Sequence, residues 1–158
     1  MNDPYRLRRF ELAQNDANTY QAAVAQLRAG HKTSHWMWFI FPQISGLGQS
    51  SMSRTYAIAS LAEAKAYLAD PVLGSRLIEC TRILTELTGA TAQQIFGLTD
   101  AMKLRSSMTL FARAAPGNVL FEQVLNDYFD GAPDQATESR LKACDPDPRQ
   151  PPPSGVHT

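Results

Sequence analysis

The sequence predicts an all-α fold, a compact multihelical single domain with a buried central helical element. Three observations lead to this prediction. Helix start and stop signals recur along the chain, apolar residues recur three and four positions apart, and alternating apolar–polar segments of strand length are almost absent. The chain of 158 residues has the length of one domain, which we expect to span residues 1–143.

Start and stop signals in the sequence define the ends of the predicted helices. Asp-Pro pairs at residues 3–4 and 70–71 are start signals, because Asp can cap a helix and Pro suits its first position. The other predicted starts are side chains that can cap: Asp16, Ser50 or Ser51, Ser60 in a capping box with Glu63, Thr91, Thr99 or Asp100, Asn118 and Asp134. Predicted stops are Gly30, Gly89, Pro116-Gly117 and Gly131-Ala132-Pro133.

Apolar stripes indicate what these helices bury. The residues with helical spacing are Leu7 and Phe10; Tyr20, Val24 and Leu27; Leu73, Leu77, Cys80, Leu84 and Leu87; Leu104, Met108 and Phe111; and Phe121, Val124, Leu125, Tyr128 and Phe129. The run from Trp36 to Phe41 is apolar at every position. Periodicity therefore does not distinguish a buried strand from a buried helical turn there.

The composition changes at residue 144. Residues 144–158 hold five of the ten prolines and almost nothing apolar. We therefore expect a disordered Pro-rich tail, with a proline-motif ligand as the less favoured alternative.

Charge and cysteine usage narrow the function classes. Fifteen Lys and Arg balance fifteen Asp and Glu, so the net charge gives no reason to expect a nucleic-acid partner. No apolar run is long enough for a membrane span, and the N-terminus lacks a signal-peptide core. Cys80 and Cys144 lie far apart, which suggests neither a disulfide nor a metal site. We expect a cytoplasmic protein without a cofactor or membrane partner; the sequence leaves protein partners open.

The first candidate cluster lies between residues 31 and 56. It contains both tryptophans, Trp36 and Trp38, within a longer stretch, residues 17–62, that has no acidic residue. This local cationic bias favours an anionic ligand. The motif ISGLGQSS, at residues 44–51, could cradle a phosphate, because glycines let backbone N–H groups approach a ligand.

Each of these features also has a plainer explanation. The glycine motif could be a tight turn followed by an ordinary helix cap. The aromatic run could be core packing rather than a stacking platform, with one Trp packed and the other at the mouth of a pocket. His31 and His35 have metal-ligand spacing for a helix, but Gly30 ends the preceding helix and no acid lies nearby, so we predict no metal site.

The second candidate cluster is the predicted helix that includes residues 100–109. Asp100 and Lys103 can pair on it, and Lys103 lies on one flank with Ser106 and Ser107. A cation beside two hydroxyls could bind phosphate or carboxylate, although a solvated face with a surface ion pair is the plainer alternative. Ser and Thr are mediocre residues inside helices, so their presence there needs compensation.

Three blocks resemble a known family. They are GHKTSHWMWFIFPQISGLGQSSMSRTYAI, EAKAYLADPVLGSRL and IFGLTDAMKLRSSMTLF. They are similar to the bacterial family called domain of unknown function 1810, over nearly all of residues 3–141. The resemblance implies a mainly helical domain with central buried helices and no established activity; the label calpastatin, which some members carry, does not fit this globular composition. The family's characteristic residues would be Lys32, Ser34, His35, Trp36, Trp38, Pro42, Gln43, Gly46, Gly48, Ser50, Asp100, Lys103, Ser106, Ser107 and Phe111.

We predict that the two clusters meet in one site that binds an anionic small molecule of the nucleotide or ADP-ribose type. Trp36 or Trp38 would stack on a ring. The groups expected to hold a phosphate are the amides of Gly46 and Gly48 with Lys32 and Lys103; the other expected ligand-binding residues are Ser34, Gln43, Ser50, Ser106 and Ser107.

A hydrolytic reaction at this site would use His35 as general base, or Asp100 instead, with Lys103 stabilising charge. The competing prediction is a protein-interaction module without chemistry. In that case the Trp-rich motif is structural core, and its polar residues satisfy the buried backbone.

Overall fold

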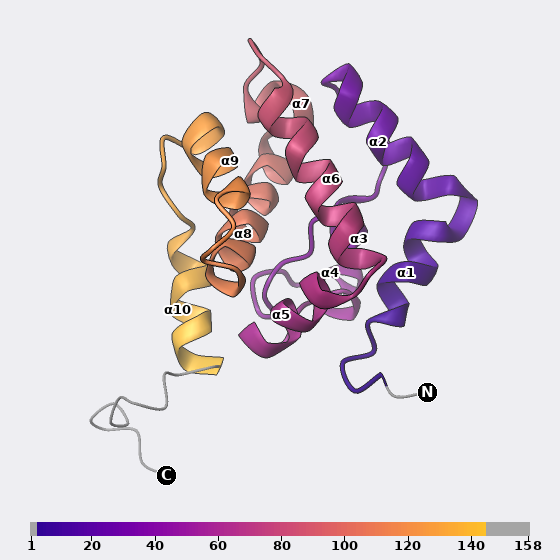
Figure 1. The fold of residues 1–158 in the computed structure, drawn as a ribbon, viewed down its shortest axis with the longest axis vertical. Coiled ribbons are helices and arrows are strands. Elements are labelled where there is room, and N and C mark those ends of the chain that lie inside the picture. The colour runs from indigo at the N-terminus through magenta and orange to yellow at the C-terminus, as the bar shows by residue number, and fades with distance from the viewer. Residues whose placement is uncertain (1–2, 145–158) are drawn as a thin grey trace.

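Helices make up almost all the regular structure of this protein. The computed structural model describes residues 3–144. In chain order the elements are α1 (Arg8–Asn15), the 3-10 helix η1 (Asp16–Asn18), α2 (Thr19–Ala29), α3 (Met37–Ile40), α4 (Ser51–Thr55), α5 (Leu61–Ala69), α6 (Leu73–Glu86), α7 (Ala92–Phe96), α8 (Leu98–Ala114), α9 (Leu120–Phe129) and α10 (Gln135–Cys144) (Figure 1). Apart from an isolated parallel bridge between Ile44 and Ile58, the described residues form no strand. The predicted all-α fold is confirmed.

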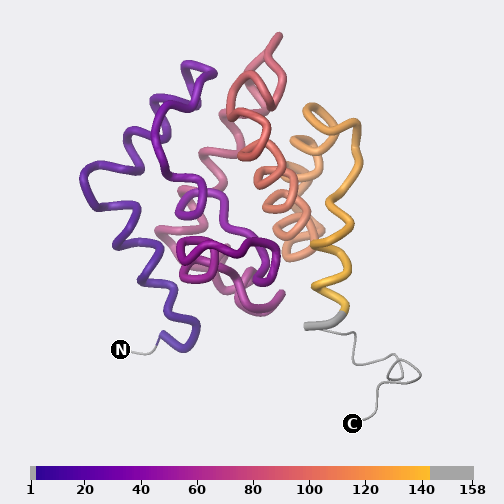
Figure 2. Tube along the Cα trace, turned by 180° about the vertical axis from the view of Figure 1, so that it is seen from behind, coloured from indigo at the N-terminus to yellow at the C-terminus, as the bar shows by residue number. Residues whose placement is uncertain are grey.

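Helix α8 lies at the centre of the arrangement. It packs against α5, α7, α9 and α10, while α6 packs between α9 and α2 (Figure 1). The segment that connects α2 to α5 lies across the face turned to the viewer in Figure 2, and it approaches α10 there. This segment carries the first candidate cluster and α8 carries the second. Lys32 of the segment pairs with Asp100 of α8. Lys103 of α8 lies over the ring of Trp38, so the two clusters are in contact.

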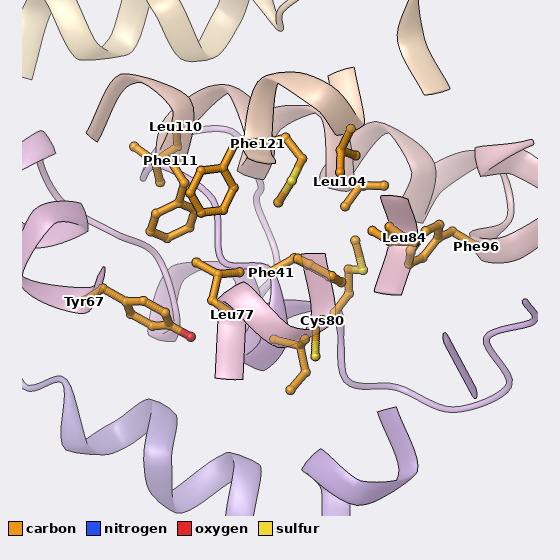
Figure 3. Packing of buried hydrophobic residues seen from close by; sticks show 14 of the residues in the cluster. Phe41, Tyr67, Leu77, Cys80, Leu84, Phe96, Leu104, Leu110, Phe111 and Phe121 are labelled. Carbon is orange, nitrogen blue, oxygen red and sulfur yellow. The ribbon is translucent and has the colours of Figure 1, made fainter. Parts of the chain in front are cut away.

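The core is built around α8. Every residue from 106 to 111 is buried, so this helix is enclosed on all sides over that stretch. Its Phe111 ring lies beside Phe121 of α9, with the ring centroids 5.8 Å apart (Figure 3). The predicted α6 stripe is buried as well, from Leu73 to Leu84. Burial raises the pKa of the Cys80 thiol in that stripe to about 12, which suits a core residue.

The apolar run between α2 and α4 is a helical turn rather than a strand. Trp36 and Phe41 flank the single turn of α3 and are buried beside each other and Phe96, with ring centroids 6.3 Å apart. The Phe39 carbonyl accepts a hydrogen bond from Gln14 Nε2 (2.7 Å) of α1. A side chain from another helix therefore satisfies this backbone, and no partner strand is needed.

Most predicted caps are present. The side-chain oxygens of Ser50, Ser60 and Thr91 each accept a hydrogen bond from the backbone three residues later. Gly30 ends α2 in the left-handed conformation, and Asp134 accepts from the first turn of α10. These signals act within four residues of the helix end, which is why the sequence predicts them well.

The predicted starts of two helices, α2 and α8, are wrong. The second helix begins at Thr19 instead of Asp16, because Ala17 and Asn18 take positive φ angles and form a kink. Helix α8 begins at Leu98, because the preceding glycine, with φ of 81°, lets α8 follow α7 directly. The side chain of Asp100 is therefore not needed as a cap.

The box predicted at Ser60 also differs. Glu63 accepts from the backbone N–H of Ala59 (3.0 Å) and pairs with Arg9 (3.0 Å), so it is a buried partner of α1.

At the C-terminal end, α10 includes Cys144, and the rest of the predicted Pro-rich tail, residues 145–158, lies outside the described residues. No helix found between residues 3 and 144 is long and apolar enough to cross a membrane.

Candidate functional site

Three charged side chains from distant parts of the sequence form one cluster. Lys32, just after α2, places its Nζ 2.7 Å from Asp100 Oδ2, and Lys103 Nζ lies 3.2 Å from Asp100 Oδ1. The Lys32 side chain is 8% exposed, Asp100 19% and Lys103 21%. One carboxylate between two ammonium groups leaves one surplus positive charge, and these partly buried charges interact more strongly than they would at an open surface.

The two lysines keep Asp100 ionised. Burial by itself would raise the pKa of this carboxyl, but hydrogen bonds and charge from Lys32 and Lys103 outweigh that effect. The pKa of Asp100 therefore lies below its ordinary value. A carboxylate held in this way balances charge and is a weak base.

Each lysine of the cluster also lies over a tryptophan ring. Lys32 Nζ is 5.2 Å from the ring centroid of Trp36, and Lys103 Nζ is 4.4 Å from that of Trp38. A cation over an aromatic face is attracted by the negative face of the ring, by about 0.5–2 kcal/mol depending on solvation. Trp36 and Trp38, which flank Met37 in the sequence, are thus linked through their lysines to the same carboxylate, Asp100.

The Trp36 end of the cluster is closed. Trp36 is 1% exposed, and its Nε1 donates to Gln26 Oε1 (2.9 Å) of α2. The same oxygen accepts from the backbone N–H groups of Thr33 (2.8 Å) and Ser34 (3.1 Å), and Gln26 Nε2 donates to Ser34 Oγ (2.7 Å). Every polar group of this network has a partner, so it serves the fold.

The Trp38 end is open to a cavity of about 430 Å³ between the α3–α4 segment, α8 and the start of α10. Its lining is formed by Trp38, Gln43, Leu47, Gly48, Gln49, Ser50, Ser53, Thr99, Met102, Lys103, Ser106, Asp134 and Ala136. The Nε1 atom of Trp38 is buried and has no hydrogen-bond acceptor among the described residues. The cavity therefore combines a cation, an aromatic ring and several hydroxyl and amide groups.

The structure brings part of the predicted site to this cavity. The predicted residues that line it are Trp38, Gln43, Gly48, Ser50, Lys103 and Ser106. The predicted residues that do not line it are Lys32, Ser34, His35, Trp36, Gly46, Asp100 and Ser107. His35 is exposed between α2 and α3, whereas Ser107 is fully buried inside α8 and its Oγ has no partner among the described residues. Because Trp36 is buried, only Trp38 can meet a ligand.

The two glycines of the α3–α4 segment have packing reasons. Gly46 has φ of 92°, and an added Cβ would lie 2.5 Å from the Arg140 guanidinium, which donates to the Gly46 carbonyl (3.1 Å). A Cβ on Gly48 would lie 2.5 Å from Ser53 Oγ. Ser50 caps α4 by accepting from the Ser53 backbone (3.1 Å). The motif is thus a tight turn followed by an ordinary cap.

Sequence reasoning missed the part of Asp134 in this site, because it treated Asp134 only as a helix start. Ser106 Oγ donates to Asp134 Oδ2 (3.1 Å), and Thr109 Oγ1 accepts from the Asp134 backbone (2.9 Å). Two hydroxyls inside α8, those of Ser106 and Thr109, thus bond to Asp134 in addition to the carbonyls of Met102 and Arg105 in their own helix. One indirect signal of this role was present in the sequence, namely Ser and Thr inside a helix. The two partners themselves, Ser106 and Thr109, lie 28 and 25 residues from Asp134.

Fold and site together define a class of protein, an all-α domain in which a Lys–Asp–Lys cluster adjoins a polar cavity. The chain belongs to the family described as "Protein of unknown function (DUF1810)", whose model matches residues 4–141. A crystal structure of the conserved hypothetical protein Rv1873 from Mycobacterium tuberculosis is similar, with 48% sequence identity and a TM-score of 0.85. The match covers 88% of this chain and 98% of that one. The comparison with curated proteins finds no match.

Proposed function

We propose that the cavity binds an anionic small molecule whose ring packs against Trp38, with ligands of the nucleotide or ADP-ribose type as the first candidates. The observation that carries this proposal is the surplus positive charge of the Lys–Asp–Lys cluster, which reaches the cavity through Lys103. An anion that pairs with Lys103 would balance the cluster.

Lys103 is the less tightly held cation of the cluster. Its distance to the Asp100 carboxylate is 3.2 Å, against 2.7 Å for Lys32, and its side chain is the more exposed of the two. An ammonium group has three N–H donors, and only one of those of Lys103 is used by Asp100. The remaining donors suit the oxygens of a phosphate or carboxylate.

Trp38 supports the same ligand class. A buried donor without an acceptor costs about 1–3 kcal/mol, and the Nε1 of Trp38 is such a donor. A small shift of the indole toward a ligand oxygen would supply its acceptor. The ring itself offers an apolar surface beside the cation, which suits a ligand with both a ring and a negative group.

The proposal is for binding rather than for hydrolysis. His35 and Asp100, the two bases that the sequence suggested, lie outside the cavity lining, and Asp100 is committed to two lysines. We propose the cytoplasm as the place of action, because the cysteine usage suits a reducing compartment.

One observation favours the alternative of a protein-interaction module. Leu98 and Met102 lie one turn apart on α8 and are 66% and 47% exposed, and Met102 lines the cavity. Exposed apolar side chains beside a cavity can mark a contact with a partner. If the protein is an interaction module, no small anion should raise its Tm.

A thermal-shift series tests the proposal. ADP-ribose, AMP and inorganic phosphate are titrated against the wild type, Lys103→Met and Lys65→Met. Lys65 is an exposed lysine of α5 outside the cavity, so its variant loses the same charge elsewhere. A ligand that binds only the folded state raises the Tm as its concentration passes its Kd.

We expect ADP-ribose or AMP to raise the Tm of the wild type and of Lys65→Met equally. Loss of a charged hydrogen bond in Lys103→Met should weaken binding by about tenfold or more. Absence of any shift across the series in the wild type would refute the proposal. An equal shift in Lys103→Met would exclude this cavity as the site.

A further inference from the structure

A carboxylate lines the same cavity as Lys103, so the wall of the cavity carries both signs of charge. Asp134 precedes α10, and its Oδ2 accepts hydrogen bonds from the Thr137 backbone (3.0 Å), the Thr137 hydroxyl and Ser106 Oγ (3.1 Å). Its own backbone N–H donates to Thr109 Oγ1 (2.9 Å). These four hydrogen bonds hold the carboxylate in one orientation between α8 and α10.

The other oxygen of this carboxylate is not used. Among residues 3–144, Asp134 Oδ1 accepts no hydrogen bond, whereas Oδ2 accepts three. An ionised carboxylate only accepts hydrogen bonds, so a group that fits against Oδ1 must be a donor. Lys103, which attracts anions, and Asp134, whose Oδ1 is free to accept a hydrogen bond, both line one cavity.

These two demands restrict the ligand. A bare anion satisfies Lys103 but is repelled by Asp134, since like charges at close range disfavour each other. A ligand that satisfies both carries a negative group and, separately, a hydroxyl. We propose that the cavity selects phosphate-bearing sugars, with a sugar hydroxyl donating to Asp134 Oδ1 and the phosphate at Lys103.

This inference rests on the proposed function and adds that a sugar hydroxyl of the ligand is recognised. The volume of about 430 Å³ lies within the range of roughly 300–1,000 Å³ that is usual for small-molecule sites. The indole of Trp38 lines the same space and offers an apolar face for the C–H groups of a sugar ring. Gln43 and Gln49 add amide groups at the wall.

Two ligands of equal charge test the inference on the wild-type full chain. Isothermal titration calorimetry compares ribose 5-phosphate with butyl phosphate, which has no hydroxyl on its carbon chain. We expect ribose 5-phosphate to bind about tenfold to a hundredfold more tightly, as one hydrogen bond to a charged group implies. Equal affinities would overturn the inference and leave anion binding at Lys103 standing. Binding of neither phosphate, together with no response to AMP or ADP-ribose, would overturn the proposed function as well.

A variant then tests the carboxylate itself. Asp134→Asn keeps the helix cap, because Asn caps as well as Asp, but it replaces the unused acceptor oxygen with a donor N–H₂ group. Ribose 5-phosphate should lose most of its advantage over butyl phosphate, whose own binding should be unchanged or stronger. The matched control is Asp70→Asn, because Asp70 caps α6 through Val72 and Leu73 and does not line the cavity.

The ratio of the two affinities decides the outcome. A ratio in Asp134→Asn equal to that of the wild type and of Asp70→Asn would overturn the inference. Far-UV circular dichroism checks that the variants are folded. Should Asp134→Asn fail to fold, the comparison of the two phosphates on the wild type still decides whether the hydroxyl is recognised.

Discussion

The two tryptophan–lysine pairs of this protein have the same composition and opposite surroundings. Trp36 and Lys32 form a closed pair, in which the indole N–H reaches Gln26 and the ammonium reaches Asp100. Trp38 and Lys103 form an open pair, in which the indole N–H has no acceptor and both residues line a cavity. A structural tryptophan and a candidate binding tryptophan therefore differ in whether their polar partners are satisfied, and not in residue type.

The largest expected effect comes from removing either ring. Trp36→Ala deletes a side chain that is 1% exposed in the core, so we expect a loss of about 3–5 kcal/mol in the free energy of unfolding. Trp38→Ala deletes a half-buried ring that lines the cavity and should cost only about 1–2 kcal/mol while abolishing ligand binding. Chemical denaturation with guanidinium chloride measures both. Equal losses in the two variants would contradict the assignment of Trp36 to the core and Trp38 to the cavity wall.

The next effect concerns the carboxylate that joins the two pairs. Asp100→Asn leaves Lys32 without a counter-charge at a site where its side chain is 8% exposed. Breaking a fully buried pair costs about 3–5 kcal/mol, so for this partly exposed one we expect about 2 kcal/mol. Asp127→Asn, at an exposed position of α9, is the control and should have almost no effect. A loss no larger than that of the control would show that the cluster does not stabilise the fold.

The same substitution has a pH signature. The pKa of Asp100 is lowered in the folded state, so its ionised form stabilises the protein above the unfolded pKa of about 4. That stability is lost as the pH falls through the folded value. The difference in unfolding free energy between wild type and Asp100→Asn should therefore shrink as the pH falls from 7 to below about 4. A constant difference over that range would contradict the lowered pKa.

The smallest effect is spectroscopic. Trp38→Phe leaves Trp36 as the single tryptophan, and Trp36→Phe leaves Trp38, so excitation near the red edge of the tryptophan band reports one indole at a time. Acrylamide should quench Trp38 more steeply than Trp36, and only Trp38 emission should respond to a ligand of the cavity. Equal quenching of both residues, or a ligand response from Trp36 alone, would reverse the assignment of the closed and open ends.

Local features of the fold could be predicted from the sequence. Ser50, Ser60 and Thr91 cap their helices as predicted, because a cap acts on backbone groups only a few residues away. The stripe from Leu73 to Leu84 is buried for a similar reason, since its spacing alone puts it on one helix face. The start of α8 was missed because Gly97 allows two helices to meet with no cap between them.

The charge of the first cluster shows where sequence reasoning stops. The stretch from residue 17 to residue 62 has no acid, which indicates a cationic surface. In the fold, Arg28 lies 3.6 Å from Glu79 and Lys32 lies 2.7 Å from Asp100, so acids from α6 and α8 neutralise much of that charge. The surplus remains at Lys103, on α8, outside the stretch.

By itself the sequence determined the helical class, most helix ends, the buried stripes and the residues from which a site could be made. Those features depend on interactions within one helix or one turn, where residues that are close in sequence are also close in space. The packing of the helices was needed to show which Trp is core, which lysine faces the cavity, and that Asp134 adjoins Ser106. Such pairings join residues tens of positions apart, so they depend on how the helices pack, and the spacing of residues along the chain does not contain them.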